Sequence, residues 1–299
     1  MYDILIIGAG PAGLSAALYA SRAGKSVLIL ERMTPGGQLS TIGTIENYPP
    51  FPSVTGPELA MQFLEAGTKN GAELRYEDAV RLTLGDIKKV ETNMGNTYEA
   101  RCVILATGAE PRTLGLDGEE ALKGRGVSYC VTCDGALFRG KPVALAGGSA
   151  HAAEEAHFLS QHAEKVYVLC PGAVPKALIK TENMEILPFT VPISLHAENG
   201  LLSAITVKDR DGKETTLSVR GLFVAMGYTP ANRLCTEIPL SKGGYILTHR
   251  EMATEKDGVF AAGDIREKSL RQIVTAASDG ATAAVSALRY LKTKEAERK

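Results

Sequence analysis

The sequence lacks a long hydrophobic run and an excess of one charge. No apolar run approaches the ~20 residues that a membrane-spanning helix needs. The apolar start YDILIIG is too short for a signal peptide and has no cationic leader. The 299 residues carry a formal net charge of -1, so there is no basic field to attract nucleic acid or anionic lipid. We therefore expect a cytoplasmic protein that binds neither membranes nor nucleic acid.

Cysteine is also scarce, and two of the five cysteines lie close together in the segment YCVTCDG. In a reducing compartment, a close pair such as Cys130 and Cys133 is more often metal-binding or catalytic than structural. A zinc site would need two more ligands, but Cys102 lies in a predicted buried strand, and Cys170 and Cys235 are isolated. The pattern favours a dithiol–disulfide redox couple, with a zinc site and a static disulfide as the alternatives.

The residues next to the pair fit redox chemistry. A helix that begins at or near the pair would lower the pKa of one thiol through its N-terminal dipole. Asp134 follows Cys133 directly and is suited to exchange the proton that moves when a mixed disulfide resolves. The candidate catalytic residues are therefore Cys130, Cys133 and Asp134.

Short apolar strands alternate with helical patterns along the chain. The order DILIIGAG, PAGLSAALYASRAG, KSVLILE is strand, helix, strand, which predicts an α/β fold with a parallel, doubly wound sheet. IIGAGPAG and ILATGAEP recur loosely as ALAGGSAHA and FVAMGYTP, which indicates two Rossmann-like dinucleotide-binding domains. The late strand GVFAAGD has no counterpart in the second copy. We expect a second domain, 112–238, inserted into a first domain made of 1–111 and 239–299.

A dinucleotide-binding turn lies at the start of the chain. Gly8, Gly10 and Gly13 form G-x-G-x-x-G between a predicted strand and helix, and Glu31 ends the next strand. The glycines allow a tight turn, close approach of a pyrophosphate, and close packing of helix on strand. An acid at position 31 suits ribose hydroxyls and disfavours a 2′-phosphate, so FAD or NAD fits and NADP does not.

Two later strand ends favour FAD over NAD. ILATG and AAGD, with Thr107, Gly108, Gly263 and Asp264, both end strands that point to the same crevice. A carboxylate such as that of Asp264 is unfavourable in an apolar core, but it suits the ribityl or pyrophosphate groups of FAD. The first domain is therefore predicted to bind FAD.

Several longer motifs carry a family resemblance. GAGPAG, GGQL, ENYP, ATGAEPR, GRGVSYCVTCDG, FRGKPVA, GVFAAGD and RQIVTAASDGATAA occur in the order found in the low-molecular-weight thioredoxin reductases, which the chain resembles over nearly its whole length. The resemblance implies a homodimer with FAD in the first domain and a cysteine pair on the second that reduces a thioredoxin-like protein. The residues expected around the flavin are Gly8, Gly10, Pro11, Ala12, Gly13, Glu31, Arg32, Gly37, Gln38, Asn47, Thr107, Gly108, Gly263, Asp264, Arg271, Gln272 and Ile273.

The second domain departs from the family pattern, which binds NADPH there through a G-x-G-x-x-A turn and an arginine-rich segment. In AGGSAHAAEEA, Ser149 stands where the second glycine belongs, and CPGAVPK from Cys170 to Lys176 has lost both arginines. Each lost charged hydrogen bond is worth ~1.5–3 kcal/mol, so the two losses weaken a 2′-phosphate complex by about 100-fold or more. The sequence favours a member that is reduced by ferredoxin or carries a second flavin.

Other functions fit the same motifs. A thioredoxin reductase that uses NADH, or NADPH weakly, would keep the cysteine pair and FAD. A dithiol oxidase would run the chemistry in reverse, forming disulfides in a small molecule and passing electrons to oxygen. A flavoprotein scaffold or redox sensor would have the fold without turnover.

Overall fold

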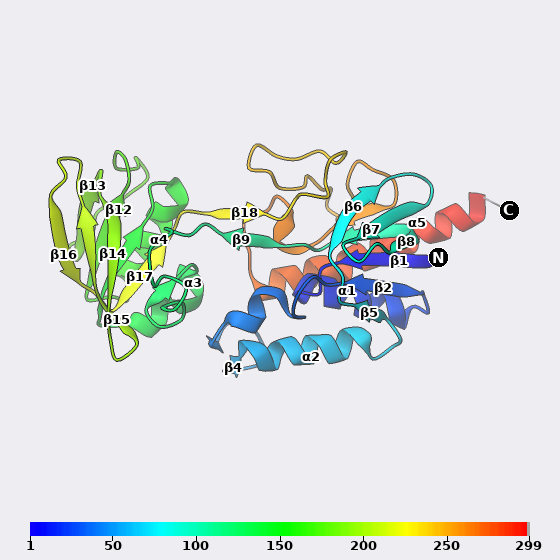
Figure 1. Cartoon of the computed structure of the whole chain (residues 1–299), viewed down its shortest axis with the longest axis horizontal. Helices are drawn as coiled ribbons and strands as arrows, with labels where there is room; N and C mark the ends of the chain where they lie inside the picture. The colour runs from blue at the N-terminus through cyan, green and yellow to red at the C-terminus, as the bar shows by residue number, and fades with distance from the viewer. Residues whose placement is uncertain (298–299) are drawn as a thin grey trace. The chain divides into compact units, whose positions relative to one another are not determined.

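The computed structural model describes residues 1–297 and divides into two compact units (Figure 1). The first unit is Met1–Glu110 together with the chain from Thr229 on, and the second is the contiguous insertion Pro111–Tyr228. The sequence predicts the return to the first unit at 239, and this boundary is too late. Leu234, Cys235 and Ile238 are already buried in the core of the first unit. The ten residues 229–238 therefore belong to the first unit.

The main sheet of the first unit runs in the order β5-β2-β1-β8-β7-β6, with β19 alongside β8. The strands β5, β2, β1, β8 and β19 are parallel, and β7 and β6 add on antiparallel. Buried side chains line both faces of β1, which is typical of a parallel sheet covered on both sides. The strands are β1 Tyr2–Ile7, β2 Val27–Leu30, β5 Glu73–Arg75, β6 Ala79–Thr83, β7 Lys88–Thr92, β8 Thr97–Leu105 and β19 Val259–Ala261.

The helices of the first unit begin at clear sequence signals. Helix α1 (Pro11–Arg22) has Gly10 as its N-cap and proline in its first turn, where the missing N–H costs nothing. Helix α2 (Gly56–Thr68) starts with a capping box between Thr55 and Glu58. The predicted closing helix is α5 (Ile273–Glu297). The other short elements of this unit are η1 Gly37–Thr41, β3 Thr44–Ile45, β4 Val54–Thr55 and η3 Gly263–Ile265.

The second unit has its own parallel sheet, in the order β10-β17-β11-β12-β13, and an antiparallel sheet, β14-β15-β16. Helix α4 (Ala150–Ser160) follows β11, and the short helix α3 (Val131–Asp134) follows β10. The chain passes between the units through β9 (Ala109–Pro111) and β18 (Tyr228–Pro230), which pair with each other. The remaining elements are β10 Val127–Ser128, η2 Gly135–Phe138, β11 Pro142–Ala146, β12 Lys165–Cys170, β13 Met184–Pro188, β14 Val191–Glu198, β15 Leu201–Lys208, β16 Glu214–Ser218 and β17 Gly221–Val224.

The α/β class with two sheets of parallel strands is as predicted. Among residues 1–297, none of the helices combines the length and the apolar character needed to cross a membrane.

Candidate functional site

The three glycines of the first turn have different surroundings. Gly8 has a φ of 105°, and a Cβ there would lie 2.4 Å from the Ala106 carbonyl oxygen. A Cβ on Gly13 would lie 1.9 Å from the Gly8 carbonyl oxygen. A Cβ on Gly10 would meet no atom of the described chain within 4 Å. Gly8 and Gly13 are therefore needed for packing, whereas Gly10 borders open space at the N-terminus of α1, where backbone N–H groups suit a pyrophosphate.

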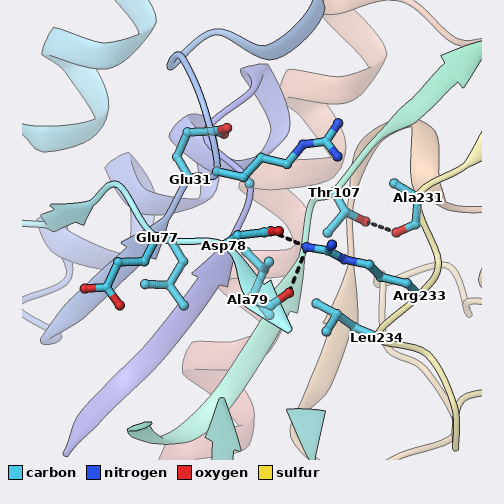
Figure 2. Close-up of a pocket in the computed structure, with 12 residues that line it drawn as sticks. Glu31, Glu77, Asp78, Ala79, Thr107, Ala231, Arg233 and Leu234 are labelled. Atoms are coloured by element: carbon cyan, nitrogen blue, oxygen red, sulfur yellow. Dashed lines mark hydrogen bonds and ion pairs between the residues drawn. The ribbon is translucent and has the colours of Figure 1, made fainter. Parts of the chain in front are cut away.

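A pocket opens beside this turn, at the ends of β1 and β2 (Figure 2). Glu31 lies in its wall and is only 8% exposed. The Glu31 carboxylate accepts hydrogen bonds from the backbone N–H groups of Ala9, at 2.8 Å, and Met33, at 2.9 Å. Each carboxylate oxygen has a second lone pair, so the group can still accept from a ribose hydroxyl. The lining residues are Ile7, Gly8, Leu30, Glu31, Arg32, Glu77, Asp78, Ala79, Thr107, Ala231, Arg233 and Leu234.

Of these twelve residues, the sequence predicts four as site residues, Gly8, Glu31, Arg32 and Thr107, and six others come from segments that no sequence motif marks. Glu77 and Asp78 lie directly before β6 and Ala79 begins it, whereas Ala231, Arg233 and Leu234 come from the segment that re-enters the first unit. No local motif marks them. The only available signal is a pair of acids, in YEDAV, directly before a strand.

Two further groups of predicted flavin residues come together around the glycine turn. A Cβ on Gly37 would lie 3.5 Å from the Gly10 Cα, and one on Gly263 would lie 2.8 Å from the Ala12 Cβ. The Gln38 side chain donates to the Ala109 carbonyl at 2.8 Å. The polar ends of two other predicted residues also meet, because Asn47 Nδ2 donates to Gln272 Oε1 at 3.1 Å.

Asp264 carries a buried acceptor that the protein leaves unused. Within residues 1–297, its Oδ1 accepts no hydrogen bond, and the nearest cation, Lys268 Nζ, is 3.5 Å away. Burial raises the pKa of Asp264, and the nearby cations Lys268 and Arg271 oppose that rise. The neighbouring Asp279 is better satisfied, since it accepts from the Gly263 N–H at 3.1 Å. An unsatisfied buried acceptor beside a phosphate-binding turn fits the ribityl hydroxyls of a flavin.

The remaining predicted flavin residues lie at strand ends and helix starts of the first unit, and Arg271 contacts Asp264 directly. The Arg271 guanidinium stacks on the Tyr245 ring at 4.0 Å and donates to the Asp264 carbonyl at 3.5 Å. Ile273 begins α5 and Pro11 begins α1. The Gly108 carbonyl accepts from Ala231 N–H at 3.0 Å. The residues present therefore fit FAD along the carboxyl ends of β1, β8 and β19.

The cysteine pair lies in the second unit. Cys130 and Cys133 form a disulfide, with their Cα atoms 5.3 Å apart. Cys130 is the N-cap of α3, as the sequence predicted a helix start near the pair. Helix α3 has only four residues, so its dipole is smaller than that of a full-length helix. Among residues 1–297, the other three cysteines, Cys102, Cys170 and Cys235, are unpaired and buried.

Asp134 is held beside the disulfide by Ser128, a residue that no sequence motif marks. Ser128 Oγ donates to Asp134 Oδ2 at 2.6 Å and accepts from the Cys130 N–H at 3.1 Å. Burial raises the pKa of Asp134, and the hydrogen bond from Ser128 opposes the rise. This carboxyl therefore holds a proton more readily than an exposed aspartate, which suits it to proton exchange with a thiol.

The residue before the pair is also anchored from two sides. The Tyr129 carbonyl accepts from the Tyr228 hydroxyl at 2.9 Å, and the Tyr129 hydroxyl donates to Glu119 at 2.7 Å. Glu119 is buried and also accepts from the backbone N–H of Leu114 at 2.9 Å. These bonds hold the backbone that leads into Cys130.

The second nucleotide-type turn is closed by its own side chains. Ser149 is the N-cap of α4, and its hydroxyl accepts from the Ala152 N–H at 3.0 Å. A Cβ on Gly148 would lie 3.3 Å from Pro171 Cδ. One backbone N–H of the first turn of α4 is thus already bonded, and a proline ring lies against the turn.

Comparisons with known proteins agree with the motifs. Residues 2–280 match the family described as pyridine nucleotide-disulphide oxidoreductase. The chain is 41% identical to the thioredoxin reductase of Bacillus subtilis, over 98% of this chain and 95% of that protein. Its fold matches the thioredoxin reductase of Streptococcus pyogenes with a TM-score of 0.92 and 39% identity, over 98% and 99% of the two chains.

A second solved relative is named for an electron donor, ferredoxin. The ferredoxin-flavin thioredoxin reductase of Clostridium acetobutylicum is 32% identical, over 98% of both chains, with a TM-score of 0.54. The predicted fold and family resemblance are confirmed. The chain belongs to the thioredoxin reductases within the pyridine nucleotide-disulphide oxidoreductase family, and it is an FAD-dependent oxidoreductase of that type.

Proposed function

We propose that this chain reduces the disulfide of a thioredoxin-like protein through Cys130 and Cys133, with electrons that reach FAD from a donor other than NADPH. Reduced ferredoxin or a second flavin is the favoured donor. The observation that carries the proposal is the second nucleotide turn, where Ser149 caps α4 with its own hydroxyl.

The cysteine pair carries the disulfide chemistry. Two electrons and two protons convert the Cys130–Cys133 disulfide into two thiols, and bound FAD supplies these electrons as a pair after accepting them from the donor. One thiolate then attacks the partner disulfide, and the second cysteine resolves the mixed disulfide and releases a reduced partner. Asp134, whose burial favours the protonated form, holds a proton next to Cys133 for these steps.

Two features of the second unit argue against NADPH. The first is the turn, because the Ser149 hydroxyl occupies the Ala152 N–H and Pro171 packs against Gly148. The second is the segment CPGAVPK, which presents one lysine where two arginines would grip a 2′-phosphate. The relative from Clostridium acetobutylicum, named for ferredoxin, supports a protein donor for this chain as well.

The test is anaerobic reduction of the flavin, followed by its visible absorbance. We expect reduced ferredoxin to bleach the flavin quickly, and NADPH and NADH to bleach it slowly or not at all. Rapid bleaching by micromolar NADPH would overturn the donor assignment and leave the thioredoxin-reductase chemistry standing. Counting flavins per chain in the same sample distinguishes one bound FAD from two.

A gain-of-function variant serves as the matched control. Pro171→Arg with Gly172→Arg restores two cations to the segment, and Ser149→Gly reopens the turn. The triple variant is expected to respond more to NADPH than to NADH, because only NADPH carries the 2′-phosphate that the arginines bind. An equal response to both nucleotides would show that the missing arginines do not decide the donor.

The family resemblance also leads us to propose a homodimer. Light scattering coupled to gel filtration should give twice the chain mass of 31.7 kDa.

A further inference from the structure

Ala231, Arg233 and Leu234 form one wall of the pocket beside Glu31, and we call the segment 231–234 the strap (Figure 2). The strap is tethered at both ends. At one end, Thr107 Oγ1 donates to the Ala231 carbonyl at 2.9 Å and the Ala231 N–H donates to the Gly108 carbonyl at 3.0 Å. At the other end, Arg233 donates to the Ala79 carbonyl at 2.9 Å and pairs with the Asp78 carboxylate.

The charges of the pocket identify which part of a dinucleotide it takes. Both lining arginines already have carboxylate partners, Arg32 with Glu110 and Arg233 with Asp78. Glu31 adds a further negative charge at the ribose position. A phosphate would meet this negative surface at a cost, whereas an uncharged adenosine would not. The pocket therefore suits the adenosine end of a dinucleotide.

Arg233 has the geometry of an aromatic-ring partner. Arg233 lines the pocket, and its side chain is 53% exposed although Asp78 and Ala79 hold its guanidinium. In Figure 2 the side chain reaches across the pocket to these two residues. A guanidinium fixed in this way keeps its plane available to stack on an aromatic ring.

We propose that Arg233 is an adenosine-binding residue whose tethered guanidinium covers the adenine ring of FAD. The proposal rests on the flavin binding of the proposed function and is independent of the electron donor. Its contribution to binding is confined to the adenosine half, so the flavin ring and its chemistry are unaffected.

The experiment uses the full-length chain stripped of flavin. Affinities for FAD and FMN are measured by flavin fluorescence, and the affinity for ADP by competition with FAD. Arg233→Met is expected to weaken FAD and ADP binding by a common factor of about 3- to 30-fold and to leave FMN binding unchanged. Asp78→Asn should weaken FAD and ADP in the same direction, because it removes one tether and leaves the arginine in place.

Two controls separate stacking from a merely structural tether. Lys165→Met breaks the ion pair between Lys165 and Glu185 in the second unit, whose side chains are similarly exposed, and should leave all three affinities unchanged. Thermal unfolding of the flavin-free variants reports any loss of fold. If Arg233→Met fails to fold, Arg233→Lys keeps a charge that can pair with Asp78 but loses the planar group, and its FAD affinity should still fall.

Three results would overturn the proposal. They are wild-type FAD affinity in the folded Arg233→Met variant, an unchanged ADP affinity, or an equal loss for FAD and FMN. Failure of the stripped wild-type protein to bind FAD would count against the proposed function itself, and so against both.

Discussion

Substitution of the turn glycines should separate the requirements of the fold from those of the cofactor. Gly10 has a φ of -78° and a ψ of -175°, which alanine adopts without strain. Alanine is a poorer N-cap than glycine. It also lowers the conformational entropy of the unfolded chain, which stabilises the folded protein by about 0.4–1 kcal/mol. Because these effects oppose each other, Gly10→Ala should change the free energy of unfolding of the flavin-free protein by less than about 1 kcal/mol.

The same substitution should damage FAD binding. The new methyl group would occupy the open space at the N-terminus of α1, where the pyrophosphate approaches the backbone. Crowding of this kind typically costs about 1–3 kcal/mol, which corresponds to a loss of affinity of about 5- to 150-fold.

Gly13→Ala is the matched comparison, and it should damage the fold of the flavin-free protein. Its Cβ would lie 1.9 Å from the Gly8 carbonyl oxygen, a backbone atom that cannot move aside cheaply. The gain in helix propensity, about 1 kcal/mol, is too small to offset such an overlap. We expect the flavin-free protein to lose at least about 2 kcal/mol, a fall in Tm of several degrees at about 2–4 °C per kcal/mol.

The assay is thermal unfolding of the flavin-free variants together with fluorescence titration of FAD. Equal destabilisation of the flavin-free protein by Gly10→Ala and Gly13→Ala would contradict the assignment of Gly10 to the cofactor and Gly13 to the fold. Wild-type FAD affinity in Gly10→Ala would contradict it as well.

Three further substitutions test the redox pair and the core. Cys133→Ser should abolish thioredoxin reduction and leave FAD affinity unchanged. Retained turnover would show that the cysteine pair does not pass electrons to the partner disulfide. Asp134→Asn should slow disulfide reduction about 100-fold. Since burial raises the pKa of Asp134, the wild type loses stability as pH rises from the ordinary aspartate pKa through the raised one, and the variant's unfolding profile should lack this loss. Lys88 is 1% exposed, its amine has no hydrogen-bond partner within residues 1–297, and burial lowers its pKa. Wild-type stability therefore rises with pH between that lowered pKa and the ordinary one, and Lys88→Met should add about 1–3 kcal/mol at neutral pH, less near pH ~10. A constant difference across pH would contradict the burial argument.

The sequence allows most of the fold to be predicted because its signals are local. The strands flanking the first turn read as short apolar runs, and Gly8 and Gly13 are spaced as a βα turn requires. The return boundary at 239 was too late because the residues from Ala231 to Ile238 have no strand pattern. They belong to the first unit only through contacts such as that between Arg233 and the Ala79 carbonyl.

In the candidate site, too, residues marked by local sequence signals were predicted, and residues joined only by long-range contacts were not. Glu31 is predictable because it stands at a set distance from the glycine turn, and Cys130 and Cys133 because they are neighbours in the chain. Asp78 and Arg233 lie more than half the chain apart, and only the folded sheet brings them together. Ser128 was missed for a different reason, since a serine before a cysteine pair has many ordinary roles, and only its two hydrogen bonds reveal this one.

The inserted topology has a consequence for synthesis on the ribosome. The first unit is incomplete until the end of translation, since β19 pairs with β8 and a Cβ on Gly280 of α5 would lie 2.0 Å from the Ala12 carbonyl oxygen. The second unit is contiguous and emerges whole much earlier. It should therefore fold before the unit that contains the N-terminus, the reverse of the usual order. Ribosome-bound chains stalled well past Tyr228 should already yield a protease-resistant fragment of the inserted unit, while β8 still lacks its pairing with β19.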